Sequence, residues 1–127
     1  MRYNCNKKMF SFTSAERLHT QNDFNKIFKN GSRLENENIK VFAFKRNDGQ
    51  VIRRLGLVTP RKVGTAVVRN RTKRRLREIF RTNKHLLKPC LDLIFISNSG
   101  TASLDYYNLE KSILNLLKSA KLYTGLE

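Results

Sequence analysis

The sequence predicts a mixed α/β domain, an α+β two-layer sandwich with the element order α-β-β-β-α-β-α. Two kinds of hydrophobic period carry this prediction. Residues 39–44 alternate between two faces like a strand, and residues 91–97 form a nearly continuous apolar run. Residues 66–83 and 105–121 instead repeat their apolar side chains at helical spacing. Because a helix connects the strand before residue 60 to the strand at residue 91, we expect these two strands to be parallel.

The first predicted helix begins near residue 20. Thr20 to Asp23 form an N-terminal capping pattern, in which a threonine side chain accepts a hydrogen bond from a backbone N–H of the first turn. Three apolar residues then follow at the i, i+3, i+4 spacing of one helix face: Phe24, Ile27 and Phe28. Asn30 and Gly31 end the helix, and we expect Gly31 to adopt the left-handed conformation.

The next segment predicts a sheet with two dissimilar faces. In the strand at residues 39–44 the odd positions are apolar and suit a core. The even positions form an aromatic face with one cation: Lys40, Phe42 and Phe44. Asn47-Asp48-Gly49 is typical of a tight turn, so we expect a strand at residues 51–59 to pair with the first one as a hairpin. Residues 32–34 fit a short leading strand.

The helix at residues 66–83 has one face for a core and one for an anion. At about 100° per residue, one stripe consists of Val68, Thr72, Leu76 and Ile79, with Phe80 at its edge. The opposite side consists of Asn70, Lys73, Arg74, Arg77 and Arg81. Residues 61–81 contain nine Lys or Arg and one acid, so they carry +8 of the chain's +16. Like charges four residues apart reduce helix stability by about 0.2–0.5 kcal/mol per pair, so a helix selected for stability alone would mix its charges. Arginine is also the cation best suited to phosphate. We therefore favour an anion-binding surface over a merely solvated one.

The end of the chain completes the domain. Residues 91–97 predict an interior strand. The last helix, at residues 105–121, has a predicted buried stripe of Leu109, Ile113, Leu116 and Ala120. The length suits a single domain, which we place at residues 15–127 after a flexible N-terminal arm of residues 1–14. Phe10 and Phe12 of that arm fit packing against the domain as well as exposure.

Composition narrows the function. Twenty-six basic against ten acidic residues among 127 favour a polyanionic partner. No run approaches the roughly 18 apolar residues of a transmembrane helix. The apolar stripe of the basic helix is needed for the core, so we also expect no membrane-surface partner. Residues 1–14 lack the apolar centre of a signal peptide. Cys5 and Cys90 are far apart, which argues against a disulfide framework or a zinc site and for a cytoplasmic location.

Catalysis by protein side chains is not expected. The acids are scattered instead of clustered as Mg²⁺ ligands. Glu35 and Glu37 share a strand face that suits solvent, and Asp92 in its apolar strand suits a structural hydrogen bond. His19 and His85 have no acid or cysteine nearby in the sequence. We expect no catalytic residue, no metal ligand, no protein-bound cofactor and no small-molecule substrate.

Nucleic-acid binding is expected in two parts. The basic helix, with Arg61 and Lys62 of the preceding loop, predicts a phosphate-binding surface whose affinity falls with salt. The second part is aromatic and consists of Phe24, Phe28, Phe42 and Phe44, with Lys40. Single-stranded bases stack on such rings for about 1–3 kcal/mol each. Phenylalanines at helical spacing fit a core equally well, so the pattern leaves both interpretations open for Phe24 and Phe28.

The chain resembles the protein subunit of bacterial ribonuclease P over residues 17–122. The motif that carries the resemblance is Arg61-Lys62-Val63-Gly64-x-Ala66-Val67-x-Arg69-Asn70-Arg71-x-Lys73-Arg74-x-Leu76-Arg77-Glu78, which is similar to that family's signature helix. Further matches are Leu18, Asp23-Phe24, Ile27-Phe28, Gly31, Leu55-Gly56-Leu57 and the strand from Asp92 to Ile96. The family has a left-handed β-α-β crossover, against the right-handed rule that holds in about 98% of cases, and we expect one through the basic helix.

The resemblance implies an RNA-binding subunit of an endoribonuclease whose chemistry is carried by RNA. In that family a large RNA hydrolyses precursor tRNA, with Mg²⁺ held mainly by the RNA, and leaves the mature 5′ end. The implied partners are ribonuclease P RNA, at a 1:1 ratio, and precursor tRNA. A structural RNA-binding protein of the ribosomal type is the alternative. The aromatic sheet face favours the first interpretation, because phosphate contacts alone need no exposed rings.

The resemblance also assigns roles to residues. Contacts with the RNA subunit are implied for Arg61, Lys62, Arg69, Asn70, Arg71, Lys73, Arg74 and Arg77. A cleft for the 5′ leader is implied between the first helix and the sheet, lined by Phe24, Phe28 and Phe42, and we add Phe44 and Lys40 from the same sheet face.

Overall fold

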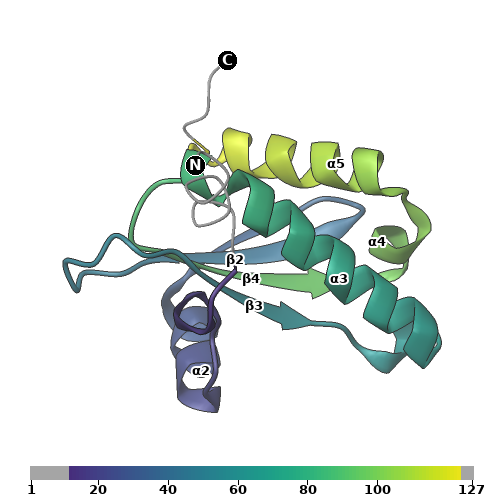
Figure 1. Cartoon of the computed structure of the whole chain (residues 1–127), viewed down its shortest axis with the longest axis horizontal. Coiled ribbons are helices and arrows are strands. Elements are labelled where there is room, and N and C mark those ends of the chain that lie inside the picture. The colour runs from purple at the N-terminus through teal and green to yellow at the C-terminus, as the bar shows by residue number, and fades with distance from the viewer. Residues whose placement is uncertain (1–11, 124–127) are drawn as a thin grey trace, which may run out of the picture.

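The computed structural model describes residues 12–123, in which helices flank both faces of a four-stranded sheet (Figure 1). The main elements in chain order are α2 (Gln21–Asn30), β1 (Ser32–Glu35), β2 (Ile39–Lys45), β3 (Arg54–Val58), α3 (Ala66–Asn83), β4 (Leu91–Ser97), α4 (Ser99–Ser103) and α5 (Tyr106–Ser119). Single 3-10 turns are η1 (Ser14–Glu16), η2 (Arg61–Val63) and η3 (Lys84–Leu86). The α/β class is confirmed, and α3 has the predicted bounds. The sheet carries helices on two faces, so α2 adds a third, partial layer.

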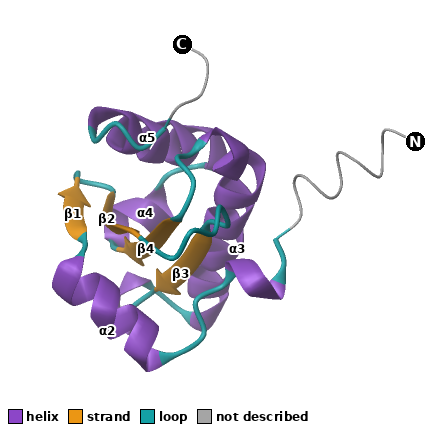
Figure 2. Cartoon of the chain, turned by 90° about the vertical axis from the view of Figure 1, so that its left-hand side faces the viewer, coloured by secondary structure: helices purple, strands orange, loops and turns teal. Residues whose placement is uncertain are grey.

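The strand order is β1-β2-β4-β3 (Figure 2), which corrects the predicted hairpin. β2 pairs antiparallel with β1 on one side and with β4 on the other. Among the strands, β3 has β4 as its neighbour, and the two are parallel, as the helical connection predicted. β4 is therefore an interior strand, and the hairpin of this sheet is the one between β1 and β2. The strand expected from residue 51 begins at Arg54.

Arg46, buried directly after β2, holds the chain out of the predicted hairpin. Its guanidinium donates to Asp48 Oδ2 at 2.9 Å, to the Ile52 carbonyl oxygen at 2.6 Å and to Asp92 Oδ1 of β4 at 2.7 Å. The turn expected at residues 47–49 is present, with Gly49 at φ 76°. The hydrogen bonds of Arg46 fold residues 46–53 into a loop, and the chain then reaches the far edge of β4.

The connection from β3 through α3 to β4 is left-handed. In Figure 1 both strands run to the right, and α3 returns above the sheet. Figure 2 looks from the left of Figure 1 and places β3 to the right of β4, which is the side nearer to the viewer of Figure 1. For the viewer of Figure 1 the chain therefore turns anticlockwise, to the right along β3 and back to the left along α3, while it moves away from the viewer to β4. This combination is a left-handed turn. This agrees with the family resemblance and departs from the usual right-handed rule.

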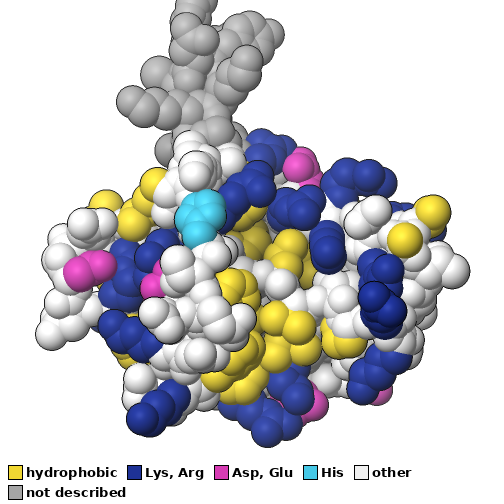
Figure 3. Space-filling view, turned by 90° about the horizontal axis from the view of Figure 1, so that it is seen from below, with side chains coloured by type: hydrophobic (Ala, Val, Ile, Leu, Met, Phe, Trp, Pro, Cys, Tyr) yellow, Lys and Arg dark blue, Asp and Glu magenta, His cyan; other side chains and the backbone are white. Residues whose placement is uncertain are grey.

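The lower face of the sheet is covered only in part, by α2. Leu18, Ile27 and Ile94 are buried there and form a small second cluster with half-buried phenylalanines. Seen from below, apolar side chains gather at the centre of this face and Lys and Arg side chains surround them (Figure 3). The sheet therefore has one face for stability and one face that keeps apolar groups accessible.

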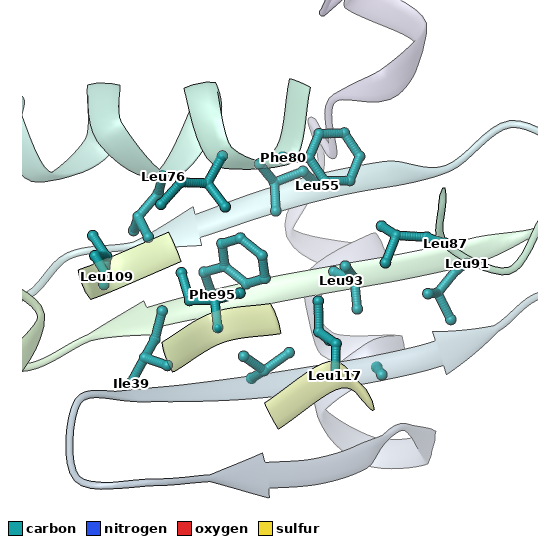
Figure 4. Packing of buried hydrophobic residues seen from close by; sticks show 14 residues of the cluster. Ile39, Leu55, Leu76, Phe80, Leu87, Leu91, Leu93, Phe95, Leu109 and Leu117 are labelled. Atoms are coloured by element: carbon teal, nitrogen blue, oxygen red, sulfur yellow. The ribbon is translucent and has the colours of Figure 1, made fainter. Parts of the chain in front are cut away.

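The upper face of the sheet builds the main core with α3 and α5 (Figure 4). Leu76 of α3, Phe95 of β4 and Leu109 of α5 are each at most 1% exposed. The predicted stripe of α3 is buried from Thr72 to Phe80. In α5 the buried residue of the last turns is Leu117, which corrects the predicted stripe: Leu116 is half-buried, and half-buried Ala120 lies just after the helix ends at Ser119.

Of the two predictions for the ends of α2, the N-terminal cap is confirmed and the conformation of Gly31 is wrong. Thr20 caps the helix as predicted, since its hydroxyl accepts from Asp23 N–H at 3.1 Å. Gly31 ends the helix, but with φ −81° and not in the left-handed conformation. Its role is steric: a β-carbon there would lie 2.6 Å from the Ile27 carbonyl oxygen and 2.9 Å from that of Ala43. Glycine thus allows α2 to turn directly into the sheet.

Residues 12–18 pack on the domain. The Phe12 ring contacts Phe80 edge-on, with 5.5 Å between centroids. Leu18 N–H donates to the Leu55 carbonyl oxygen at 3.0 Å, and buried Glu16 forms an ion pair with buried Lys84. Of the arm predicted at residues 1–14, residues 1–11 lie outside the described residues. Its described end, Phe12 to Ser14, is held against the domain by these contacts.

Candidate nucleic-acid interface

The basic surface is formed by η2 and the outer side of α3. Thr65 caps α3, accepting from Val68 N–H at 3.3 Å. The polar side of α3 faces away from the sheet, because Leu76 and Phe80 on its opposite side are buried in the core. The residues assigned to the RNA subunit are all exposed or half-buried: Arg61, Lys62, Arg69, Asn70, Arg71, Lys73, Arg74 and Arg77. None of these seven cations forms an ion pair with a carboxylate within residues 12–123.

Two other arginines of α3 have partners within the fold. Arg75 Nη1 donates to the Leu104 carbonyl oxygen at 2.9 Å and so fixes the chain before α5. Arg81, which the helical period placed with the phosphate-facing group, pairs with Glu78, its Nε lying 3.1 Å from Glu78 Oε1. The hydrogen bond from Arg81 holds the pKa of Glu78 below its ordinary value. The free positive charge is therefore concentrated on the part of α3 before residue 78.

The aromatic surface lies on the lower face of the sheet and joins α2 to β2. Phe28 packs edge-on against Phe42, with ring centroids 5.1 Å apart, and Phe24 is 6.3 Å from Phe28. Phe24 and Phe42 are half-buried, and Phe28 is 37% exposed. The rings thus support one another and keep part of their faces open. The α2 phenylalanines thus pack as core residues in part and also remain accessible, so the structure is compatible with both interpretations.

Phe44 and Lys40 lie at opposite ends of the aromatic surface. Phe44 is covered by Lys26, whose Nζ is 5.5 Å from the ring centroid. Lys40 is paired across the sheet with Ile96 and lines a hollow of about 260 Å³ together with Lys62 of η2 and Asn98 after β4. Lys40, predicted for the leader, and Lys62, predicted for the RNA subunit, therefore share one hollow.

The two surfaces meet a second time at the other edge of the sheet. Phe24 and Arg77 line one pocket of about 160 Å³ between α2, β3 and α3. The left-handed connection produces this proximity, because it carries α3 back along the β3 edge. The structure thus brings the predicted aromatic and basic residues into one continuous region bounded by two hollows.

The buried carboxylate of Asp92 is neutralised by two arginines of the fold. Buried Asp92 accepts from Arg46, and from Arg54 through Nε at 2.9 Å and Nη2 at 2.8 Å. The hydrogen bond to Asp92 raises the pKa of Arg54, although burial opposes it. Within residues 12–123 no three His, Cys, Asp or Glu side chains gather in a way that could hold a metal ion. Paired carboxylates of this kind do not fit a protein-held Mg²⁺ site.

Sequence reasoning did not single out two cations, Arg17 and Lys26. Arg17 lies in the segment before α2, with its guanidinium carbon 4.5 Å from the Phe12 ring centroid. Lys26 lies off the Phe24–Phe28 stripe, and its long side chain reaches Phe44 across the helix. The signal for Lys26 is its position between two aromatic residues of one helix. For Arg17 the sequence holds no signal, since the contact depends on how residues 12–18 pack.

None of the helices in residues 12–123 combines the length and the apolar composition of a transmembrane span.

The family model described as Ribonuclease P matches residues 12–121. The ribonuclease P protein component of Thermotoga maritima is 41% identical over 112 residues, which cover 85% of this chain and 94% of the relative. That of Clostridium novyi is 33% identical over 108 residues, covering 85% and 96%.

Solved structures agree with this similarity. The RNase P protein of Staphylococcus aureus superposes with a TM-score of 0.78 at 29% identity, covering 87% of this chain and 99% of that one. The RNase P protein from Thermotoga maritima gives a TM-score of 0.73 at 39% identity, covering 82% and 96%.

Proposed function

This chain belongs to the ribonuclease P protein family, and we propose that it binds the catalytic RNA of ribonuclease P and the 5′ leader of precursor tRNA. In this role it assists the RNA-catalysed, Mg²⁺-dependent endonucleolytic removal of the leader. One protein binds one RNA, and the complex works in the cytoplasm, where precursor tRNA is made.

The observation that carries the proposal is the coexistence of two accessible surfaces of different chemistry. Seven cations on η2 and α3 have no carboxylate partner within residues 12–123. Unpaired arginines at a convex helix face suit the phosphates of a folded RNA. The rings of Phe24, Phe28 and Phe42 lie on the lower face of the sheet, next to the basic surface, where a single strand would stack its bases.

The division of labour follows from shape and charge. The basic surface, consisting of the eight residues from Arg61 to Arg77 named above, binds the RNA subunit. The aromatic surface, consisting of Phe24, Phe28, Phe42, Phe44 and Lys40, binds the leader. A ribosomal-type scaffold protein would need the first surface alone, and a 37% exposed Phe28 would then have no use.

The RNA performs the chemistry in this proposal. The two buried carboxylates of the described residues, Asp92 and Glu16, are paired with arginine or lysine, so they are poor Mg²⁺ ligands and poor general bases. Mg²⁺ is accordingly held mainly by the RNA, and the protein contributes binding and orientation.

A cleavage assay on a 5′-extended precursor tRNA at low Mg²⁺ tests the proposal. It compares this protein alone, a bacterial ribonuclease P RNA alone, and the two together. We expect efficient cleavage only with both, and a product with the mature 5′ end. Cleavage by the protein alone would show that its own side chains catalyse the hydrolysis. The same rate with and without the protein would falsify the proposed function.

A further inference from the structure

The pocket between residues 12–18 and α3 combines an apolar interior with two cations. It measures about 160 Å³, and its walls include Phe12, Phe24 and Leu57, with Gly56 as part of its floor. Arg17 and Arg77 line it from two different segments. Neither arginine forms an ion pair with a carboxylate of the described chain. Two guanidinium groups beside an apolar wall suit a ligand that has both an anion and a flat apolar part.

The walls of this pocket are fixed in the fold. Arg17 forms a parallel β-bridge with Leu55, which extends the sheet by one residue beyond β3. Its guanidinium carbon lies 4.5 Å from the Phe12 ring centroid, and Phe12 in turn rests on buried Phe80 of α3. The backbone of Arg17 is therefore fixed before any ligand arrives, and the contact with Phe12 favours one side-chain position, which reduces the entropy lost on binding.

We propose that this pocket, the Arg17 pocket, binds one nucleotide of a single-stranded RNA segment. Its phosphate lies between Arg17 and Arg77, and its base lies against Phe24 and Leu57. Phe24 belongs to the aromatic surface, so a strand stacked on Phe28 and Phe42 reaches the pocket by passing one more ring. The volume suits one base and excludes a duplex. The inference rests on the proposed function and adds Arg17, which lies outside the signature motif, to the RNA-binding residues.

The test uses the reconstituted holoenzyme with wild-type protein, Arg17→Ala, Arg17→Gln and the control Lys111→Ala, an exposed lysine on α5. Three affinities are measured at several salt concentrations: precursor tRNA, mature tRNA, and the RNA subunit for the protein. We expect Arg17→Ala and Arg17→Gln to weaken one of these interactions about tenfold and to lower its salt slope by about one. Lys111→Ala should change none of them.

The arms of the experiment identify the source of the nucleotide. A loss confined to precursor tRNA places a leader nucleotide in the pocket, and a loss in assembly places a nucleotide of the RNA subunit there. Arg17→Gln keeps the side-chain stem over Phe12, so it tests the charge if Arg17→Ala fails to fold. Unchanged affinities and salt slopes for both variants, with an active wild-type holoenzyme, would overturn the Arg17 pocket and leave the proposed function standing.

A second arm does not depend on ribonuclease P activity. A fluorescent short oligoadenylate is titrated with the free proteins and its anisotropy is measured. We expect weaker binding for both Arg17 variants than for Lys111→Ala at equal net charge. Equal binding by all three variants would overturn the proposal even if the wild-type protein fails to stimulate cleavage.

Discussion

The ring of Phe24 lies directly against the backbone of Gly56. A β-carbon at position 56 would lie 2.6 Å from Phe24 Cζ and 3.0 Å from Leu18 Cδ1. The contact connects α2 to β3 and fixes the ring at the point where the aromatic surface meets the Arg17 pocket. Glycine at this strand position therefore allows the Phe24 ring to lie where it does, because any side chain would displace the ring.

Gly56→Ala should consequently weaken leader binding while the protein keeps its fold. The clashing atoms are the far ends of two side chains, which can move, so we expect the free energy of unfolding to change by no more than about 1 kcal/mol. Displacement of Phe24 should weaken precursor-tRNA binding by about 1 kcal/mol. Holoenzyme binding to precursor and mature tRNA, together with chemical denaturation, measures both effects. An intact fold with unchanged precursor affinity would show that the position of Phe24 does not matter for the leader.

Phe28 offers a more direct test of stacking. Because its side chain is 37% exposed, Phe28→Ala should reduce the free energy of unfolding by only about 1 kcal/mol. Loss of a stacking platform should weaken precursor binding by about 1–3 kcal/mol and leave mature tRNA unaffected. Tyr107→Ala is the matched control, since Tyr107 is an aromatic residue on α5 that is 68% exposed. Equal losses for precursor and mature tRNA would mean that Phe28 does not contact the leader.

Local patterns in the sequence predicted those parts of the fold that depend on interactions between residues close together in the chain. The bounds of α3 followed from its periodicity, and the two faces of β2 followed from alternation. The pairing of β3 did not follow. The turn at residues 47–49 forms as its residues suggest, yet the partner strand is chosen by β4, which is apolar on both faces and takes a neighbour on each side. Arg46 and Asp92, 46 positions apart, fix that choice.

The candidate site was predictable as two sets of residues and not as one region. Charge and aromatic spacing identify which side chains are suited to RNA. Their proximity depends on the left-handed connection, which places Arg77 beside Phe24 and Lys62 beside Lys40. No local pattern encodes that handedness. The position of Arg17 was not predictable for the same reason, because its contact with Phe12 exists only after residues 12–18 pack on the domain.

The basic surface predicts a specific salt dependence. Arg71 and Arg74 are exposed on α3 and have no carboxylate partner among the described residues. Arg71→Ala with Arg74→Ala should weaken binding to the RNA subunit and lower the slope of log K against log salt by about 0.9 for each lost phosphate contact. Lys111→Ala with Lys118→Ala removes the same net charge from α5 and should leave the slope nearly unchanged. A similar change of slope for both pairs would indicate that only total charge matters.

Glu16 and Lys84 provide a prediction about pH and stability. Burial raises the pKa of Glu16, but the hydrogen bonds from Lys84 and Thr13 outweigh it and hold that pKa below its ordinary value of 4.5. A carboxyl group with a lowered pKa in the folded state stabilises the fold at pH values above its unfolded pKa. That contribution is lost as the pH falls through the folded pKa. The wild-type protein should therefore lose stability on acidification from about pH 5 more steeply than Glu16→Gln.

At neutral pH, Glu16→Gln should be destabilised by about 3 kcal/mol, because Lys84 is then buried beside a neutral group. The double substitution Glu16→Leu, Lys84→Met should recover most of this loss, since it removes both charges and fills the space. Urea denaturation of the three proteins between pH 3 and pH 7 measures these differences. If the wild-type and Glu16→Gln curves stay parallel throughout, the ion pair does not anchor residues 12–18, and another contact, such as that of Phe12 with Phe80, holds the Arg17 pocket together.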